Sequence, residues 1–222
     1  MLRYKKHDLL EIVIEAIKDS GWNLLFVSRF EKHPFLVRIF KEEKSYLLRI
    51  YIWNLTHGGG TKRPADEYRI QITGIDHFER NKGEKTLILG WWDDAQVFAG
   101  FDYTKHSGKL GFSPSIQIRE NALRKAHIHG IASHNKGNGE IAVAFRPDFF
   151  VNYVEELEEI HKFADSDVDY EILEKLFEEP EQVNDETIKK VSKFRRSQIL
   201  KIKKQIRDSS FKSRVLNAYG HR

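Results

Sequence analysis

Apolar positions recur at helical spacing in the first twenty residues and then change to the alternation typical of strands. Residues 8–20 place one apolar stripe on a helical face, Asp8 and Glu11 have the spacing of a capping box, and Gly21 is suited to end the helix. Short runs of period two follow, separated by turn residues. The expected strands cover residues 22–28, 35–41, 46–53, 67–73, 86–92, 96–103, 115–118 and 140–145.

Helical spacing returns in the second half of the chain. Helices are expected over residues 119–129 and from Pro147, a residue favoured in the first turn of a helix. After about residue 165 no strand pattern remains, and helices are expected over residues 169–178, 185–206 and 211–219. We therefore predict an α+β fold, with a curved, mainly antiparallel sheet or partial barrel flanked by helices. This domain would cover residues 1–165, and an all-helical C-terminal connector would cover residues 166–222.

Composition limits the class of protein. The 222 residues are 40% hydrophobic and 12% aromatic, which is sufficient for a large core. Cysteine is absent, so disulfides and thiolate metal sites are excluded. No apolar run approaches the roughly 18 residues of a membrane span, and the N-terminus lacks the core of a signal peptide. The expected location is the cytoplasm, without a membrane partner.

Charge is distributed unevenly along the chain. Residues 155–188 contain 14 acidic and 2 basic side chains, whereas residues 189–222 contain 12 basic side chains and a single acidic one, Asp208. A basic block of this kind can follow the phosphates of DNA, or it can pair with the acidic helices before it. The sequence leaves both interpretations open. The cations expected to contact DNA from this block are Arg195, Arg196 and Lys204.

A glycine-rich segment precedes a strand with alternating polar positions. Three glycines followed by lysine and arginine make a loop with exposed amides and two cations, suited to phosphate or to a DNA groove. On the next strand, arginine and glutamine can read guanine and adenine edges. The alternative is an ordinary hairpin loop with a solvated strand face. The candidate DNA contacts here are Gly58, Gly59, Gly60, Lys62, Arg63, Arg69 and Gln71.

Other residue types carry weaker signals. Trp91 and Trp92 are candidates for stacking on an extruded base, although alternate strand positions point inward to the core. The histidines lack the spacing of a zinc site, so no metal ligand is expected among them. Acidic pairs at Asp66-Glu67 and Asp93-Asp94 are the nearest approach to a metal-dependent nuclease centre.

Several stretches resemble known DNA-processing families. GGGTKRPADEYRIQ at residues 58–71, together with stretches at residues 89–118 and 134–147, is similar to N-terminal domains of restriction-type endonucleases. The same stretches are similar to domains that accompany DNA methyltransferases, the methylase-associated kind. The final run, FKSRVLNAYGHR at residues 211–222, resembles the helix that precedes the first cysteine of HNH-family endonucleases.

The resemblance implies a module that recognises specific or modified sites in double-stranded DNA for an HNH restriction endonuclease. The nuclease domain, its activating histidine and its divalent metal would then lie outside these residues, which leaves no catalytic residue and no cofactor in this chain. The expected partner is duplex DNA, and a two-strand cut by a one-site nuclease is consistent with a homodimer. Two alternatives stay open: a self-contained metal-dependent nuclease, and a protein-interaction or oligomerisation domain without DNA binding.

Overall fold

The computed structural model describes residues 3–27, 31–57 and 63–219. The strands are β1 (Asn23–Phe26), β2 (Phe35–Lys41), β3 (Lys44–His57), β4 (Glu67–Gln71), β5 (Glu84–Trp92), β6 (Val97–Phe101), β7 (Ser115–Arg119), β8 (Ile131–Asn135) and β9 (Ile141–Phe145). The α-helices are α1 (Lys6–Asp19), α2 (Glu120–His129), α3 (Phe150–His161), α4 (Asp167–Glu178), α5 (Asp185–Ile188) and α6 (Lys193–Ala218). Short 3₁₀ turns are η1 (Asp93–Ala95), η2 (Tyr103–Lys105), η3 (Pro147–Phe149), η4 (Lys162–Asp165) and η5 (Pro180–Gln182).

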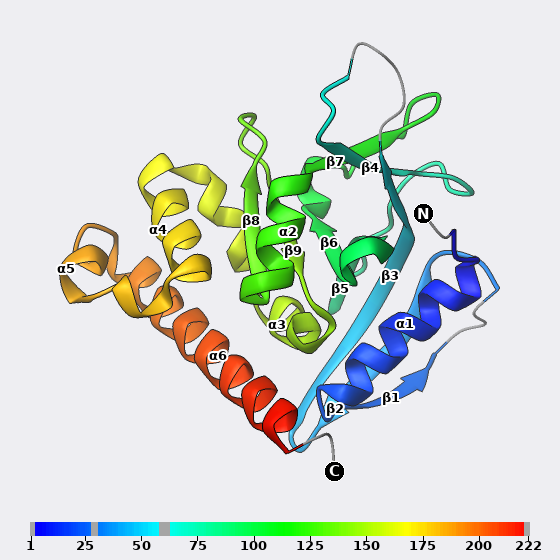
Figure 1. Cartoon of the computed structure of the whole chain (residues 1–222). Helices are drawn as coiled ribbons and strands as arrows, with labels where there is room; N and C mark the ends of the chain where they lie inside the picture. Colours follow the sequence, from blue (N-terminus) through cyan, green and yellow to red (C-terminus); the bar gives the residue numbers. More distant parts are fainter. Residues whose placement is uncertain (1–2, 28–30, 58–62, 220–222) are drawn as a thin grey trace.

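One curved sheet organises the described residues (Figure 1). Its main path runs β1-β2-β3-β5-β6-β9-β8, with β3 and β5 parallel and the other pairings in the described part antiparallel. The long strand β3 pairs with β5 through residues 47–54 and with β4 through residues 55–57. β7 then adds to β4, so the end of β3 bends into a small second sheet. The predicted α+β class with a mainly antiparallel, curved sheet is confirmed.

Both faces of the sheet are covered, which explains the almost continuous apolar run of β5. Leu87, Leu89 and Trp91 join a cluster with α1, α3, α4 and α6, whereas Ile88 and Trp92 join a second cluster with β4, β7 and α2. Strand side chains alternate between faces, so a strand buried on both faces is apolar at every position. β4 crosses close to β5 at Gly90, where an added Cβ would lie 2.7 Å from Ile70 Cγ2.

The first helix forms on the predicted stripe but begins earlier. Leu9, Leu10 and Val13 are buried, as the helical spacing requires. The helix starts at Lys6 because the Asp8 carboxylate accepts a hydrogen bond from the backbone N–H of Lys5 at 2.9 Å. The predicted capping pair of Asp8 and Glu11 is therefore wrong, since Asp8 is in the third helical position and caps the residue before the helix.

The C-terminal helices differ from their predicted bounds. The predicted helix over residues 185–206 divides into α5 and α6, because the Ser192 side chain accepts from the backbone N–H of Arg195 and starts a new helix. α6 then continues without interruption to Ala218. Ile172 of α4 and Ile199 of α6 are buried in the same cluster as α1. The domain boundary near residue 165 stays a prediction, although apolar side chains from both sides of it share one cluster.

Strand β8 was not predicted. Only Gly130, with φ of +95°, stands between the end of α2 at His129 and the start of β8 at Ile131, so no longer turn segment marks the boundary in the sequence. Within the part of the chain that the structure describes, no helix is long and apolar enough to cross a membrane.

Candidate nucleic-acid interface

A polar cavity of about 460 Å³ lies where β3 meets β4. Thr56 and Arg69 are opposite each other in the antiparallel register, so Asn54, Thr56, Arg69 and Gln71 share one face of this strand pair. The intervening residues, such as Ile70, pack into the core on the other face. The cavity is lined by Arg3, Trp53, Asn54, Thr56, His57, Arg63, Arg69, Gln71 and Thr73.

Three guanidinium groups face this cavity, and none of its described lining residues is acidic. Arg63 is exposed, whereas Arg69 is only 8% exposed and donates from Nη2 to the Glu67 carboxylate. This ion pair fixes the direction of the Arg69 side chain. Its Nε atom is buried and has no protein acceptor in the described part of the chain.

Backbone contacts hold the other lining residues in place. Asn54 Oδ1 accepts from Tyr4 N–H at 2.9 Å, and Asn54 Nδ2 donates to the Tyr4 carbonyl at 2.9 Å. This reciprocal pair brings the neighbouring Arg3 to the cavity. Gln71 Nε2 donates to the Pro114 carbonyl at 2.9 Å, which connects β4 to the segment before β7. His57 Nε2 lies within hydrogen-bonding distance of the Ala65 carbonyl, which connects the end of β3 to the segment before β4.

The structure brings together three of the residues expected to contact DNA. Arg63, Arg69 and Gln71 line one cavity, although they come from a loop and from both halves of a strand. Gly58, Gly59, Gly60 and Lys62 lie outside the described residues. Arg3 was missed, because its contribution depends on the pairing of Tyr4 with Asn54, 50 positions away. A lone arginine near the N-terminus carries no local signal for this.

The tryptophans expected to stack on a base are instead part of the core. Trp91 is 2% exposed and lies 4.8 Å from the ring of Phe98, whereas Trp92 is 1% exposed and lies 5.0 Å from the ring of Tyr68. They point to opposite faces of β5. The expectation that Trp91 and Trp92 contact DNA is corrected, because neither ring offers a free face.

Some of the cations of the basic helix α6 bind acceptors within the protein. Arg195 Nε donates to Asp169 at 2.8 Å, its Nη1 donates to Gln198 at 3.1 Å and its Nη2 donates to the Lys162 carbonyl at 3.1 Å, so each guanidinium nitrogen has an acceptor inside the protein. Arg196 donates to the carbonyls of Val191 and Lys189 at 3.0 and 2.8 Å. The expectation that Arg195 contacts DNA is therefore corrected.

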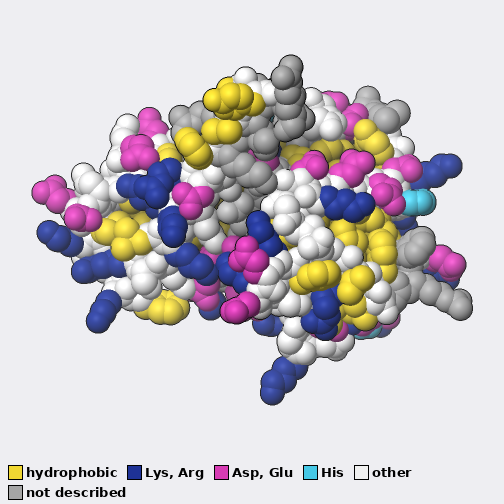
Figure 2. Space-filling model, turned by 90° about the horizontal axis from the view of Figure 1, so that it is seen from below, with side chains coloured by type: hydrophobic (Ala, Val, Ile, Leu, Met, Phe, Trp, Pro, Cys, Tyr) yellow, Lys and Arg dark blue, Asp and Glu magenta, His cyan; other side chains and the backbone are white. Residues whose placement is uncertain are grey.

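Side chains of α6 contact acidic side chains of α3. These contacts agree with the interpretation that the basic block pairs with the acidic helices before it. Lys201 lies 2.6 Å from the Glu156 carboxylate, and Gln205 donates to Glu155 at 3.0 Å. Lys204 is exposed. On the face of the molecule seen from below, basic and acidic side chains are interspersed rather than separated into blocks (Figure 2).

Three of the four acidic residues considered for a nuclease centre have other partners. Asp66 pairs with Arg119 at 2.7 Å, Glu67 pairs with Arg69, and Asp93 accepts from the Tyr4 hydroxyl at 2.7 Å. Among residues 3–27, 31–57 and 63–219, no group of three or more His, Asp or Glu side chains is placed to hold a metal ion.

Comparison with known proteins gives one match. Residues 46–154 match the family model described as Methylase-associated X1. No curated protein and no solved structure matches the chain. The matched span contains the cavity residues from Trp53 to Thr73, together with β3 from residue 46 onward and β4 to β9. Over residues 46–154, the chain resembles methylase-associated domains.

Proposed function

We propose that this chain recognises double-stranded DNA and that the cavity between β3 and β4 is its DNA-contacting site. The observation that carries the proposal is the convergence of Arg3, Arg63 and Arg69 on one cavity whose described lining has no carboxylate. Guanidinium groups bind phosphate and guanine edges through two parallel hydrogen bonds. The resemblance to methylase-associated domains supports a role in restriction and modification of DNA.

We assign phosphate contacts and base contacts to different residues of the cavity. Exposed cations such as Arg63 contact phosphates, which determines affinity and position but carries no sequence information. Arg69 is held by Glu67, so it loses little side-chain freedom when it binds a base edge. Gln71 is exposed on the same strand face and presents an amide. Gly58, Gly59, Gly60 and Lys62, which lie outside the described residues, stay predicted phosphate contacts.

We further propose that the recognised site directs an HNH nuclease elsewhere in the full protein. The nuclease domain would supply the hydrolytic water and the divalent metal, whereas this chain would supply no catalytic residue. A second copy of the chain would place a second nuclease on the opposite strand. These steps depend on the likeness of residues 211–222 to the helix that precedes HNH domains.

Binding to labelled duplexes tests the proposal directly. Fluorescence anisotropy is measured with duplexes that are unmodified, methylated at adenine or methylated at cytosine, at salt concentrations from low to physiological. We expect binding that weakens steeply with salt. Arg63→Ala should weaken it, because a phosphate contact is lost.

Arg38→Ala is the matched control. Arg38 is exposed and lies opposite Leu47 on β3, about 23 Å along the strand from the cavity at 3.3 Å per residue. Equal losses for Arg38→Ala and Arg63→Ala would show non-specific attraction and contradict the assigned site. Absence of binding at low salt would favour an interaction domain. Cleavage of the duplex with magnesium would show a self-contained nuclease.

A further inference from the structure

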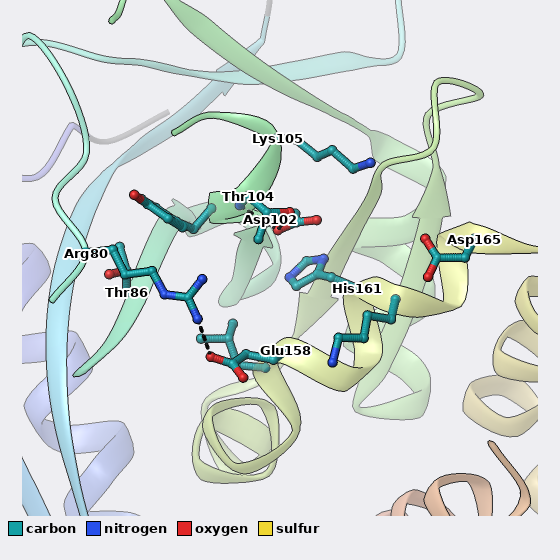
Figure 3. Close-up of a pocket in the computed structure, with 11 residues that line it drawn as sticks. Arg80, Thr86, Asp102, Thr104, Lys105, Glu158, His161 and Asp165 are labelled. Carbon is teal, nitrogen blue, oxygen red and sulfur yellow. Dashed lines mark hydrogen bonds and ion pairs between the residues drawn. The ribbon is translucent and has the colours of Figure 1, made fainter. Parts of the chain in front are cut away.

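A second cavity, of about 280 Å³, opens where β6 ends beside the last turn of α3 (Figure 3). Its walls come from η2, the start of β5, α3 and η4. It shares no lining residue with the cavity between β3 and β4. The two sites are therefore separate, and a ligand of this one is not accounted for by the proposed DNA contacts.

A buried carboxylate is at the centre of this second cavity. Asp102 is 8% exposed, and its Oδ1 accepts from Thr104 N at 2.8 Å and from Thr104 Oγ1 at 2.7 Å. Its Oδ2 has no protein donor within the described part of the chain. Oδ2 is not among the fully buried atoms left without a partner in this part of the chain, so it is open to the cavity and can accept a hydrogen bond from a bound molecule.

The neighbouring histidine does not neutralise this carboxylate. His161 Nδ1 lies 2.8 Å from the Ile141 carbonyl, which only accepts, so Nδ1 carries the hydrogen. His161 Nε2 then accepts from the Tyr153 hydroxyl at 2.9 Å. Both ring nitrogens are used, and burial lowers the pKa of His161. The ring is a neutral, fixed wall beside Asp102 (Figure 3).

The lining of the cavity carries the cations Arg80, Lys105 and Lys162 and, besides Asp102, the carboxylates Glu158 and Asp165. Arg80 pairs with Glu158 at 3.0 Å, and Lys162 pairs with Glu159 at 2.8 Å. Lys105 is exposed and has no ion pair with another described residue. Arg80 and Lys162 are paired with carboxylates, so Lys105 is the lining cation available to an anionic group of a ligand, and a neutral donor can complement Asp102 Oδ2.

We propose that this cavity binds a nucleotide whose base carries an exocyclic amino group. The amino group donates to Asp102 Oδ2, the ring of Tyr103 and the side chain of Leu157 supply apolar surface for the base, and Lys105 meets the phosphate. The volume is near the lower end of the range of about 300–1,000 Å³ for ligand pockets, which suits one nucleotide rather than two. The nucleotide is either free or extruded from a DNA strand.

Titration with deoxynucleoside monophosphates tests the recognition of the amino group. We expect dAMP or dCMP to bind more tightly than dTMP by about tenfold, because a base without the donor leaves Asp102 Oδ2 unpaired. Asp102→Asn keeps an acceptor for Thr104 and places an amide donor where Oδ2 was. This variant should reverse the preference towards dTMP. An unchanged base preference in a folded Asp102→Asn protein would overturn the proposal.

Lys105→Ala provides a second variant at an exposed position, where loss of folding is not expected. It should weaken nucleotide binding severalfold and leave binding of the corresponding nucleoside unchanged. Lys109→Ala, also exposed but outside the cavity lining, is the matched control and should have no effect. An equal loss for nucleotide and nucleoside would contradict the phosphate contact.

A parallel experiment with duplex DNA distinguishes a free nucleotide from one supplied by a DNA strand. If free nucleotides bind, the ligand is a free nucleotide. If they do not, but Asp102→Asn changes the base preference in duplex binding, the nucleotide is supplied by DNA. If neither effect is found, the proposal is wrong. Arg63→Ala separates this outcome from the proposed function, because it should weaken duplex binding and leave mononucleotide binding unchanged.

Discussion

The Nε atom of Arg195 lies 2.8 Å from Oδ2 of Asp169, and its guanidinium carbon lies 4.1 Å from the ring centre of Phe163. This one side chain connects α6 to α4 and to η4. A cation that the sequence assigns to DNA is thus part of the internal structure. The basic helix is attached to the acidic helices through a buried contact rather than displayed as a whole to solvent.

Arg195→Ala should therefore reduce stability rather than specific DNA affinity. The change leaves the partly buried Asp169 without its main partner and removes the stacked cation, for an expected loss of about 2–4 kcal/mol in the free energy of unfolding. Urea unfolding monitored by tryptophan fluorescence measures it. Lys193→Ala, an exposed change on the same helix, should stay within about 0.5 kcal/mol. Equal losses for the two variants would contradict the structural role.

A substitution at Lys204 tests whether α6 contacts DNA or has only a structural role. This residue is exposed on α6, and no ion pair joins it to another residue in the described ranges. If α6 follows the DNA backbone, Lys204→Ala should make the negative slope of log affinity against log salt less steep by about 0.9, the value for one lost phosphate contact. Arg63→Ala should reduce the steepness of this slope by a similar amount. A slope unchanged by Lys204→Ala would restrict the DNA contacts to the cavity at β3 and β4.

Much of the fold follows from local patterns. The period-two runs predicted β2 with its observed bounds, because Phe35, Val37 and Ile39 alternate with more exposed residues. β5 was found despite a continuous apolar run. Its parallel pairing with β3 could not be predicted, because that pairing depends on β4 leaving the main sheet path between them. Long-range topology of this kind has no local sequence signal.

The candidate site was predictable where its residues are close in sequence. Arg63, Arg69 and Gln71 belong to one loop and the strand after it, and strand alternation places the last two on one face. Asp102 gave no signal, because its importance arises from the distant residues of α3 and η4 that close the second cavity around it. The roles of Trp91 and Trp92 were likewise not predictable, because aromatic composition alone does not distinguish a buried core ring from a ring that stacks on a base.

Acid should destabilise the protein through His33. Burial, with a smaller effect of Lys6, lowers the pKa of His33 to about 3, while His33 Nε2 accepts from Ile52 N–H at 3.2 Å. The unfolded chain, with a histidine pKa near 6.5, then binds more protons than the folded one between these values. The stabilisation is present above about pH 6.5 and is lost as pH falls towards 3, by up to about 1.4 kcal/mol per pH unit.

His33→Gln isolates this contribution. Glutamine does not titrate and keeps an oxygen that can accept from Ile52 N–H. The free energy of unfolding is measured by urea titration at several pH values between 7 and 4. We expect the slope against pH to be smaller by about one proton in the variant. Parallel pH profiles for the two proteins would show that His33 is not the responsible group.

Gly100 and Tyr153 should show coupled effects on stability. A Cβ at Gly100 would overlap the Tyr153 hydroxyl, so Gly100→Ala should cost about 1–3 kcal/mol through overpacking. Tyr153→Phe should also cost about 1–3 kcal/mol, because it leaves the buried Nε2 of His161 without its donor. In the double variant the overlap with the hydroxyl is relieved, whereas the added methyl group still meets the ring atoms Cζ and Cε1. The combined loss should therefore be smaller than the total of the single losses.

Thermal or urea unfolding of the four proteins measures this coupling. Gly108→Ala is the control, since a Cβ there has no neighbour within 4 Å, and it should change stability by less than about 0.5 kcal/mol. Strictly additive losses would mean that the Tyr153 hydroxyl contributes nothing to the overlap at residue 100. Because His161 also forms the wall beside Asp102, Tyr153→Phe should weaken nucleotide binding, whereas Gly108→Ala should not.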